Sequence, residues 1–182
     1  MRILVTGGAR SGKSTYAEQL AQQRSQGAAV LYIATAAATD AEMEERIKLH
    51  RERRPQSWRT VESYKALGSI EFAAERVVLL DCVGFLLNNN FFEHMTDSED
   101  ISKEEADAVE EYVKQQLSDL AKCCETEGAD LIIVTNEVGS GLVPATKLSR
   151  LYRDALGRIN CHAAALSDKV FAMVCGIAVE IK

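Results

Sequence analysis

The sequence predicts an α/β domain with a largely parallel central sheet. Short runs of apolar and β-branched residues alternate with helical patterns along the chain, which is the order of elements in parallel α/β folds. The runs at 28–35, 77–81 and 131–135 are nearly continuously apolar, as expected of strands that helices cover on both faces. The 182 residues suffice for one sizeable core, so we expect a single domain that spans residues 1–182.

The first half of the chain is expected to alternate strands with helices. Strands are predicted at 2–6, 28–35, 58–63 and 77–81, and a helix follows the first of them. A second helix begins at Asp40, because acidic residues fill its first turns, basic residues fill its later turns and Pro55 ends it. A third helix is predicted at 85–95, with an acidic surface loop at 96–100 after it.

The second half contains two long amphipathic helices. Ser102 and Glu105 fit a capping box, and apolar residues then recur at three- and four-residue steps as far as Cys124. A helix is also predicted at 147–166, and strands at 131–135, 169–175 and 178–181. Ligands gather at the carboxyl ends of parallel strands, so we expect the site at the loops after residues 6, 35, 81 and 135.

The loop after the first strand has the sequence of a phosphate cradle. Residues 7–14, GGARSGKS, match the pattern G-x-x-x-x-G-K-S between an apolar strand and a helix. Glycines allow successive backbone N–H groups to turn toward an anion, and the helix N-terminus adds positive charge. Lys13 adds a further charge between phosphates. These residues predict a P-loop NTPase of the RecA-like, three-layer type that binds a nucleoside triphosphate.

Two oxygen donors predict a magnesium ion beside this loop. The Ser14 hydroxyl is suited to ligate magnesium on a bound nucleotide. Asp81 follows four apolar residues, as the carboxylate of a Walker B element does, although it could also act only as the polar cap of its strand. We expect Mg²⁺ to accompany GTP or ATP, with Ser14 and Asp81 as its protein ligands.

A basic cluster surrounds one histidine in the segment 46–59. Six arginine and lysine side chains share these fourteen positions with His50, and Glu62 follows them. One interpretation is a solvated helix end. The other is a site for phosphate or pyrophosphate, because arginine donors match phosphate oxygens. Positive surroundings also favour a neutral imidazole, which a nucleophile requires, so His50 is a candidate catalytic residue.

The remaining histidines and one loop supply the other polar candidates. His162 lies on the apolar stripe of its helix and is expected in the core, whereas His94 lies at a helix end beside the acidic loop. Asn136 and Glu137 follow a central strand. They either orient a substrate hydroxyl or a water, or cap the neighbouring backbone, and the sequence leaves both roles open.

Charge and cysteine content narrow the functional classes. A net charge of -6 and a pI near 5.2 argue against nucleic acid or an anionic membrane as the main partner. No apolar run approaches the roughly 20 residues that span a bilayer, and the first strand begins at residue 2, so we expect a cytoplasmic protein. The five cysteines lack C-x-x-C spacing and are expected as reduced, mostly packing thiols, and the three histidines lack the spacing of a zinc site.

Six blocks of the chain together resemble one family. They lie at 3–14, 31–35, 42–50, 58–62, 135–144 and 153–160, and they occur in the order of that family. The family is the bifunctional adenosylcobinamide kinase and adenosylcobinamide-phosphate guanylyltransferase of adenosylcobalamin biosynthesis. The resemblance covers essentially the whole chain.

The resemblance implies two reactions at one nucleotide site. A nucleoside triphosphate gives its γ-phosphate to the aminopropanol hydroxyl of adenosylcobinamide. GTP then transfers GMP to His50 and releases pyrophosphate, and the phosphorylated cobinamide takes up the GMP to give adenosyl-GDP-cobinamide. The resemblance also implies a homotrimer. The GTP site that it implies consists of Gly7, Gly8, Ala9, Arg10, Ser11, Gly12, Lys13, Ser14, Ile33, Ala34, Thr35, Arg51, Glu52, Arg53, Arg54, Glu62 and Asp81.

Some positions depart from the family pattern, and two other functions stay open. Asp81 replaces a more usual glutamate, Leu49 stands where some members have a second histidine, and the residues at 160–162 and 167–169 also differ. The alternatives are a P-loop small-molecule kinase without guanylyl transfer and a regulatory NTPase. The absence of an N-K-x-D-like guanine motif and of a separate effector segment disfavours the regulatory NTPase.

Overall fold

A computed structural model describes residues 1–36, 54–94 and 101–182 of the chain. In these ranges seven strands form one sheet in the order β3-β2-β4-β5-β1-β6-β7, and every neighbouring pair is parallel except β6 and β7. The predicted largely parallel sheet is therefore confirmed. The strands are β1 Arg2–Gly7, β2 Val30–Ala34, β3 Arg59–Glu62, β4 Val77–Asp81, β5 Asp130–Val134, β6 Lys169–Val174 and β7 Ile177–Glu180.

The helices also follow the predicted order. The helices in the described ranges are α1 Lys13–Ser25, the short 3-10 helix η1 Leu67–Ser69, α3 Val83–His94, α4 Lys103–Thr126 and α5 Lys147–Leu166. The capping box before α4 is confirmed, because Ser102 and Glu105 exchange both side chain to backbone hydrogen bonds. Helix α3 begins two residues before the predicted start at 85, and η1 was not predicted. The predicted helix from Asp40 and the loop at 96–100 lie outside the described residues.

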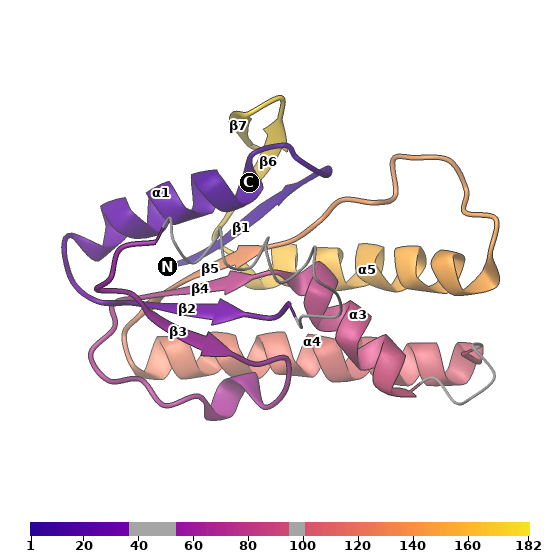
Figure 1. Ribbon diagram of the computed structural model, residues 1–182, viewed down its shortest axis with the longest axis horizontal. Coiled ribbons are helices and arrows are strands. Elements are labelled where there is room, and N and C mark those ends of the chain that lie inside the picture. The colour runs from indigo at the N-terminus through magenta and orange to yellow at the C-terminus, as the bar shows by residue number, and fades with distance from the viewer. Residues whose placement is uncertain (37–53, 95–100) are drawn as a thin grey trace.

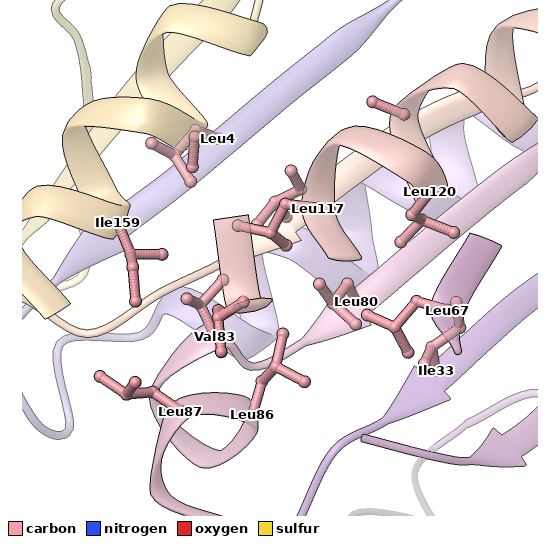
Figure 2. Packing of buried hydrophobic residues seen from close by; sticks show 14 of the residues in the cluster. Leu4, Ile33, Leu67, Leu80, Val83, Leu86, Leu87, Leu117, Leu120 and Ile159 are labelled. Carbon is pink, nitrogen blue, oxygen red and sulfur yellow. The ribbon is translucent and has the colours of Figure 1, made fainter. Parts of the chain in front are cut away.

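The domain has three layers, because helices cover both faces of the sheet. Helix α1 lies on one face, and α3, α4 and α5 lie together on the other (Figure 1). Two apolar clusters match these layers. One includes Val5, Tyr32 and Leu79 with α1, and the other includes Leu4, Ile33 and Leu80 with α3 to α5. Figure 2 shows residues of the second cluster, among them Ile33 and Leu80 of the sheet, Leu67 of η1 and Leu117 of α4.

Strand alternation decides which side chains reach the site. Successive residues of a strand point to opposite faces, and residues that pair across β2 and β4 share a face, as Tyr32 does with Leu79 and Ala34 with Asp81. Tyr32, Leu79 and the pocket residue Asp81 lie on the α1 side, whereas Ile33 and Leu80 are buried on the side of α3 to α5. The functional residues of these strands therefore come from the α1 face.

Two further findings bear on the expected class of protein. No helix in the described ranges has the length and apolar character needed to cross a membrane. All five cysteines are free thiols, and Cys82 and Cys124 are buried packing residues as expected, whereas Cys161 and Cys175 are exposed.

Glu75 anchors the chain between β3 and β4. Its buried carboxylate accepts a hydrogen bond from Arg59 Nε at 2.5 Å and another from the Ala73 N–H at 2.6 Å. Burial raises the pKa of Glu75, but these donors outweigh that effect and hold the pKa below its usual value. A lowered folded pKa gives stability that is present above the unfolded pKa and is lost as the pH falls through the folded value.

We predict that Glu75→Gln lowers the free energy of unfolding by about 1–3 kcal/mol at pH 7, since Arg59 loses its charged acceptor. The difference from the wild type should shrink as the pH falls below the ordinary glutamate pKa of 4.5. Urea unfolding of both proteins between pH 7 and pH 3 measures this. A difference that stays constant over that range would contradict the assignment.

Candidate functional site

The loop between β1 and α1 has the backbone of a phosphate cradle. Gly12, just before α1, has φ of 93°, a left-handed conformation that favours glycine. A Cβ at Gly7 would lie 2.8 Å from the Met173 carbonyl oxygen, so only glycine fits there. Helix α1 has no side-chain cap and no acidic residue in its first turn. Its N-terminal N–H groups are thus suited to an anion.

Two side chains of the loop are buried inside this cradle. The Lys13 ammonium donates a hydrogen bond to the Gly8 carbonyl at 2.6 Å, and the residue is only 7% exposed. The Ser11 hydroxyl is buried and has no hydrogen-bond partner among the described residues. Buried polar groups normally have hydrogen-bond partners, so the Lys13 ammonium and the Ser11 hydroxyl are suited to donate to a ligand with several acceptor oxygens.

A pocket of about 540 Å³ opens at the cradle, at the carboxyl edge of the sheet. The loop contributes one wall, and the ends of β2, β4 and β5 contribute the other. The structure brings the following predicted site residues together in its lining: Ala9, Arg10, Ser11, Gly12, Lys13, Ser14, Ala34, Arg54 and Asp81. Because these are backbone donors, cations and one carboxylate, the pocket suits a polyphosphate with a divalent cation.

Other predicted site residues do not line the pocket. Gly7 and Gly8 belong to the loop but are absent from the pocket lining, and Ile33 is fully buried on the opposite face of the sheet. Glu62 is exposed at the end of the edge strand β3. The predicted catalytic His50 and the predicted nucleotide ligands Arg51, Glu52 and Arg53 lie outside the described residues.

Thr35 holds the backbone of two pocket residues, Asp81 and Cys82. Its hydroxyl donates to the Cys82 carbonyl at 2.6 Å and accepts from the Cys82 N–H at 2.8 Å. The Thr35 N–H donates to the Asp81 carbonyl at 3.1 Å, and Asn89 of α3 donates to the Thr35 carbonyl at 2.7 Å. Thr35 is 1% exposed, so its side chain fixes the backbone that carries Asp81.

Sequence reasoning missed Tyr32, which contacts two predicted site residues. The Tyr32 hydroxyl donates to Asp81 Oδ2 at 2.7 Å, and the Arg54 guanidinium lies 3.3 Å from the centre of its ring. Burial and the neighbouring Asp81 carboxylate raise the pKa of Tyr32 far above its usual value, so the hydroxyl remains a donor. The sequence marks Tyr32 only by its position two residues before the predicted site residue Ala34 in the same strand.

The structure separates the roles of Asn136 and Glu137. Glu137 accepts hydrogen bonds from the Gly139 N–H at 2.6 Å and the Ser140 N–H at 3.2 Å, so it caps its own loop. The Ser140 side chain and these two N–H groups lower the pKa of Glu137. Asn136 lines the pocket, and the amide of Asn160 on α5 donates to its carbonyl at 2.9 Å. Of the two residues, only Asn136 is therefore placed to meet a ligand in the pocket.

Neither described histidine belongs to the pocket. His162 was expected in the core but is only half-buried, and its Nε2 lies 2.9 Å from the Ser118 hydroxyl of α4. His94 is exposed at the end of α3, with Nδ1 2.8 Å from the Asn90 carbonyl. Both rings therefore serve local contacts between or within helices.

We predict that Thr35→Val lowers the free energy of unfolding by about 1–3 kcal/mol and weakens nucleotide binding, because the buried N–H and C=O of Cys82 lose their partner. Thr35→Ser keeps the hydroxyl and should retain nucleotide affinity close to that of the wild type. Urea unfolding and equilibrium binding measure the two effects. A Thr35→Val variant as stable as the wild type would show that the two hydrogen bonds between the Thr35 hydroxyl and the Cys82 backbone do not stabilise the fold.

Comparison with known proteins assigns this site to a family. Residues 3–181 match the family described as cobinamide kinase / cobinamide phosphate guanyltransferase. The chain is 43% identical to the bifunctional adenosylcobalamin biosynthesis protein CobU of Escherichia coli (strain K12) and 40% identical to CobU of Salmonella typhimurium, with full coverage of both chains in each case. It is 39% identical to CobP of Pseudomonas aeruginosa, of which it covers 98%.

A solved structure supports the fold independently of sequence. The flagellar accessory protein FlaH of Methanocaldococcus jannaschii superposes with a TM-score of 0.51 and 14% identity, over 100% of this chain and 77% of that one. At this identity the likeness concerns the fold alone, and it agrees with the predicted three-layer α/β architecture. The family match and the full-length relatives show that the chain belongs to the cobinamide kinase / cobinamide phosphate guanyltransferase family of adenosylcobalamin biosynthesis.

Proposed function

We propose that both reactions of the family use the one pocket at the P-loop, and that His50 carries the guanylyl group between them. The observation that supports this most strongly is the position of Ala36 and Arg54. These residues flank the segment 37–53, and both line the pocket. In the sequence His50 stands only four positions before Arg54, so the proposed nucleophile belongs to a segment whose described ends both reach the pocket.

In the kinase reaction the pocket would bind the triphosphate of ATP or GTP. The N–H groups of the loop, Lys13 and Arg54 would neutralise the charge that the phosphates bring, and they would stabilise the γ-phosphoryl group during transfer. The acceptor is the aminopropanol hydroxyl of adenosylcobinamide. Its oxygen attacks the γ-phosphorus, the bond to the β,γ-bridging oxygen breaks, the nucleoside diphosphate leaves, and the hydroxyl proton passes to solvent.

In the guanylyl transfer the nucleophile would be a neutral imidazole nitrogen of His50. It attacks the α-phosphorus of GTP, the bond to the α,β-bridging oxygen breaks, and pyrophosphate leaves on the P-loop side. A phosphate oxygen of adenosylcobinamide phosphate then attacks the same phosphorus and releases the histidine. The product is adenosyl-GDP-cobinamide, and the cradle serves γ-phosphate transfer in one reaction and pyrophosphate departure in the other.

The donor set of the pocket fits magnesium. Ser14 and Asp81 are hard oxygen donors in the pocket lining, and only one Asp81 oxygen has a hydrogen-bond partner among the described residues, the Tyr32 hydroxyl at Oδ2. Mg²⁺ is commonly held by one or two protein groups together with substrate phosphates. When bound, it would neutralise phosphate charge and help the pyrophosphate to leave.

The decisive experiment follows the α-phosphate. The protein is incubated with α-labelled GTP and Mg²⁺ and is then denatured. We expect label that stays on the protein, is released by acid and resists base, as a phosphoramidate does. His50→Ala should retain none, whereas the control His94→Ala should label like the wild type, because His94 lies outside the pocket. Chelation of Mg²⁺ with EDTA should abolish labelling.

Two outcomes would contradict the proposal. Labelling of His50→Ala would place the guanylyl group elsewhere. A wild-type protein that phosphorylates adenosylcobinamide with γ-labelled ATP but never acquires α-label would be a small-molecule kinase without guanylyl transfer through the protein.

We also propose a homotrimer, which rests on the family resemblance. Exposed apolar side chains such as Leu142 and Val143, on the loop between β5 and α5, provide surface that an assembly could cover. Sedimentation equilibrium of the wild type should give three times the chain mass of 20.0 kDa. A monomer at micromolar concentration would contradict this proposal and would leave the chemistry of the pocket unaffected.

A further inference from the structure

Tyr32 stands between the α1-side core and the nucleotide pocket. Its side chain is 2% exposed and belongs to the apolar cluster beside α1, yet it also lines the pocket. The register of β2 and β4 pairs Ala34 with Asp81, so Tyr32 is a diagonal neighbour of Asp81 on one face of the sheet. Aromatic side chains can reach such a diagonal neighbour.

The Tyr32 side chain makes one contact through its hydroxyl and another through the face of its ring. At its tip, the hydroxyl donates to Asp81 Oδ2 at 2.7 Å. Across its ring, the Arg54 guanidinium lies 3.3 Å from the centroid. Arg54 Nη1 is 3.4 Å from the Thr60 hydroxyl, and its buried Nε has no hydrogen-bond partner in the described part of the chain.

These contacts matter because Arg54 and Asp81 carry opposite charges in one pocket. No ion pair joins these two described residues, although both line the pocket. A direct pair would satisfy each charge with the other, and in a partly dry pocket that pairing would be strong. Tyr32 instead satisfies the carboxylate with a neutral donor and the guanidinium with a neutral ring.

We propose that Tyr32 is a positioning residue of the nucleotide site, which holds Arg54 and Asp81 apart so that one charge faces the phosphates and the other faces the magnesium of the triphosphate. The inference rests on the proposed function in one respect only, namely that Arg54 and Asp81 serve the bound nucleotide. It does not depend on guanylyl transfer to His50.

Two variants separate the two contacts. Tyr32→Phe removes the hydroxyl and keeps the ring, so we expect GTP binding to weaken roughly tenfold with Mg²⁺ and to change little in EDTA. Tyr32→Leu also removes the ring, so binding should weaken roughly 3- to 30-fold even in EDTA. Titration calorimetry with GTP measures both without any chemical step. Tyr64→Phe is the matched control, because the Tyr64 hydroxyl donates to Glu93 outside the pocket, and it should bind GTP like the wild type.

Double-mutant cycles identify the residues through which Tyr32 acts. If its ring acts through Arg54, then Tyr32→Leu should add little to the loss already caused by Arg54→Ala in EDTA. If its hydroxyl acts through Asp81, then Tyr32→Phe should add little to Asp81→Asn with Mg²⁺. A Tyr32 variant that only destabilised the fold would lower affinity by the same factor in every background.

The outcomes distinguish the two levels of proposal. Additive losses in both cycles, or wild-type affinity of both Tyr32 variants, would overturn the positioning role. Wild-type affinity of both Arg54→Ala and Asp81→Asn would overturn the proposed roles of these two residues at the bound nucleotide, and the positioning role with them. If Tyr32→Leu fails to fold in thermal melts, Tyr32→Phe and its cycle with Asp81→Asn still decide the matter.

Discussion

Parallel strand register is the constraint on which the site depends. The pairings place Val5, Val134, Asp81 and Ala34 in one row across β1, β5, β4 and β2. Residues that follow this row leave the sheet at the same edge, which brings the P-loop, Thr35, Cys82 and Asn136 together from four distant parts of the sequence. A one-residue slip of β4 against β2 would turn Asp81 to the wrong face and would separate the Cys82 peptide from the Thr35 hydroxyl.

The two faces of the sheet serve different purposes: one contributes side chains to the pocket, and the other packs against the long helices. Side chains that point toward α1 at this edge meet the ligand pocket, whereas those that point toward α3, α4 and α5 form the larger apolar cluster (Figure 2). Residues beyond the strand ends then stabilise the edge: Thr35 holds the Cys82 backbone, and Asn160 of α5 holds both Thr135 and the Asn136 carbonyl. Ligand-binding groups are thus attached to a rigid layer, and the long helices behind it contribute stability.

Local patterns revealed the parts of the site that lie within one short segment. The glycine spacing of the P-loop, the carboxylate after an apolar strand and the bounds of α5 were readable because each depends on neighbouring residues. The contact of Tyr32 with Asp81 depends on which strands pair and in which register, and neither is visible in a short segment. Glu137 binds the Gly139 and Ser140 N–H groups of its own loop and does not reach the pocket. His162 reaches Ser118 only because α4 and α5 pack side by side.

The aromatic surroundings of Arg54 have a practical consequence. Trp58, the single tryptophan of the chain, is nearly buried, and its ring centre lies 6.5 Å from that of Tyr32, whose other neighbour is the Arg54 guanidinium. In the proposed nucleotide complex, a shift of the Arg54 guanidinium from the tyrosine ring toward the phosphates would change the electric field at this indole. Trp58 is thus an intrinsic fluorophore next to the pocket residue Tyr32, and its emission would report binding of the proposed nucleotide without any attached dye.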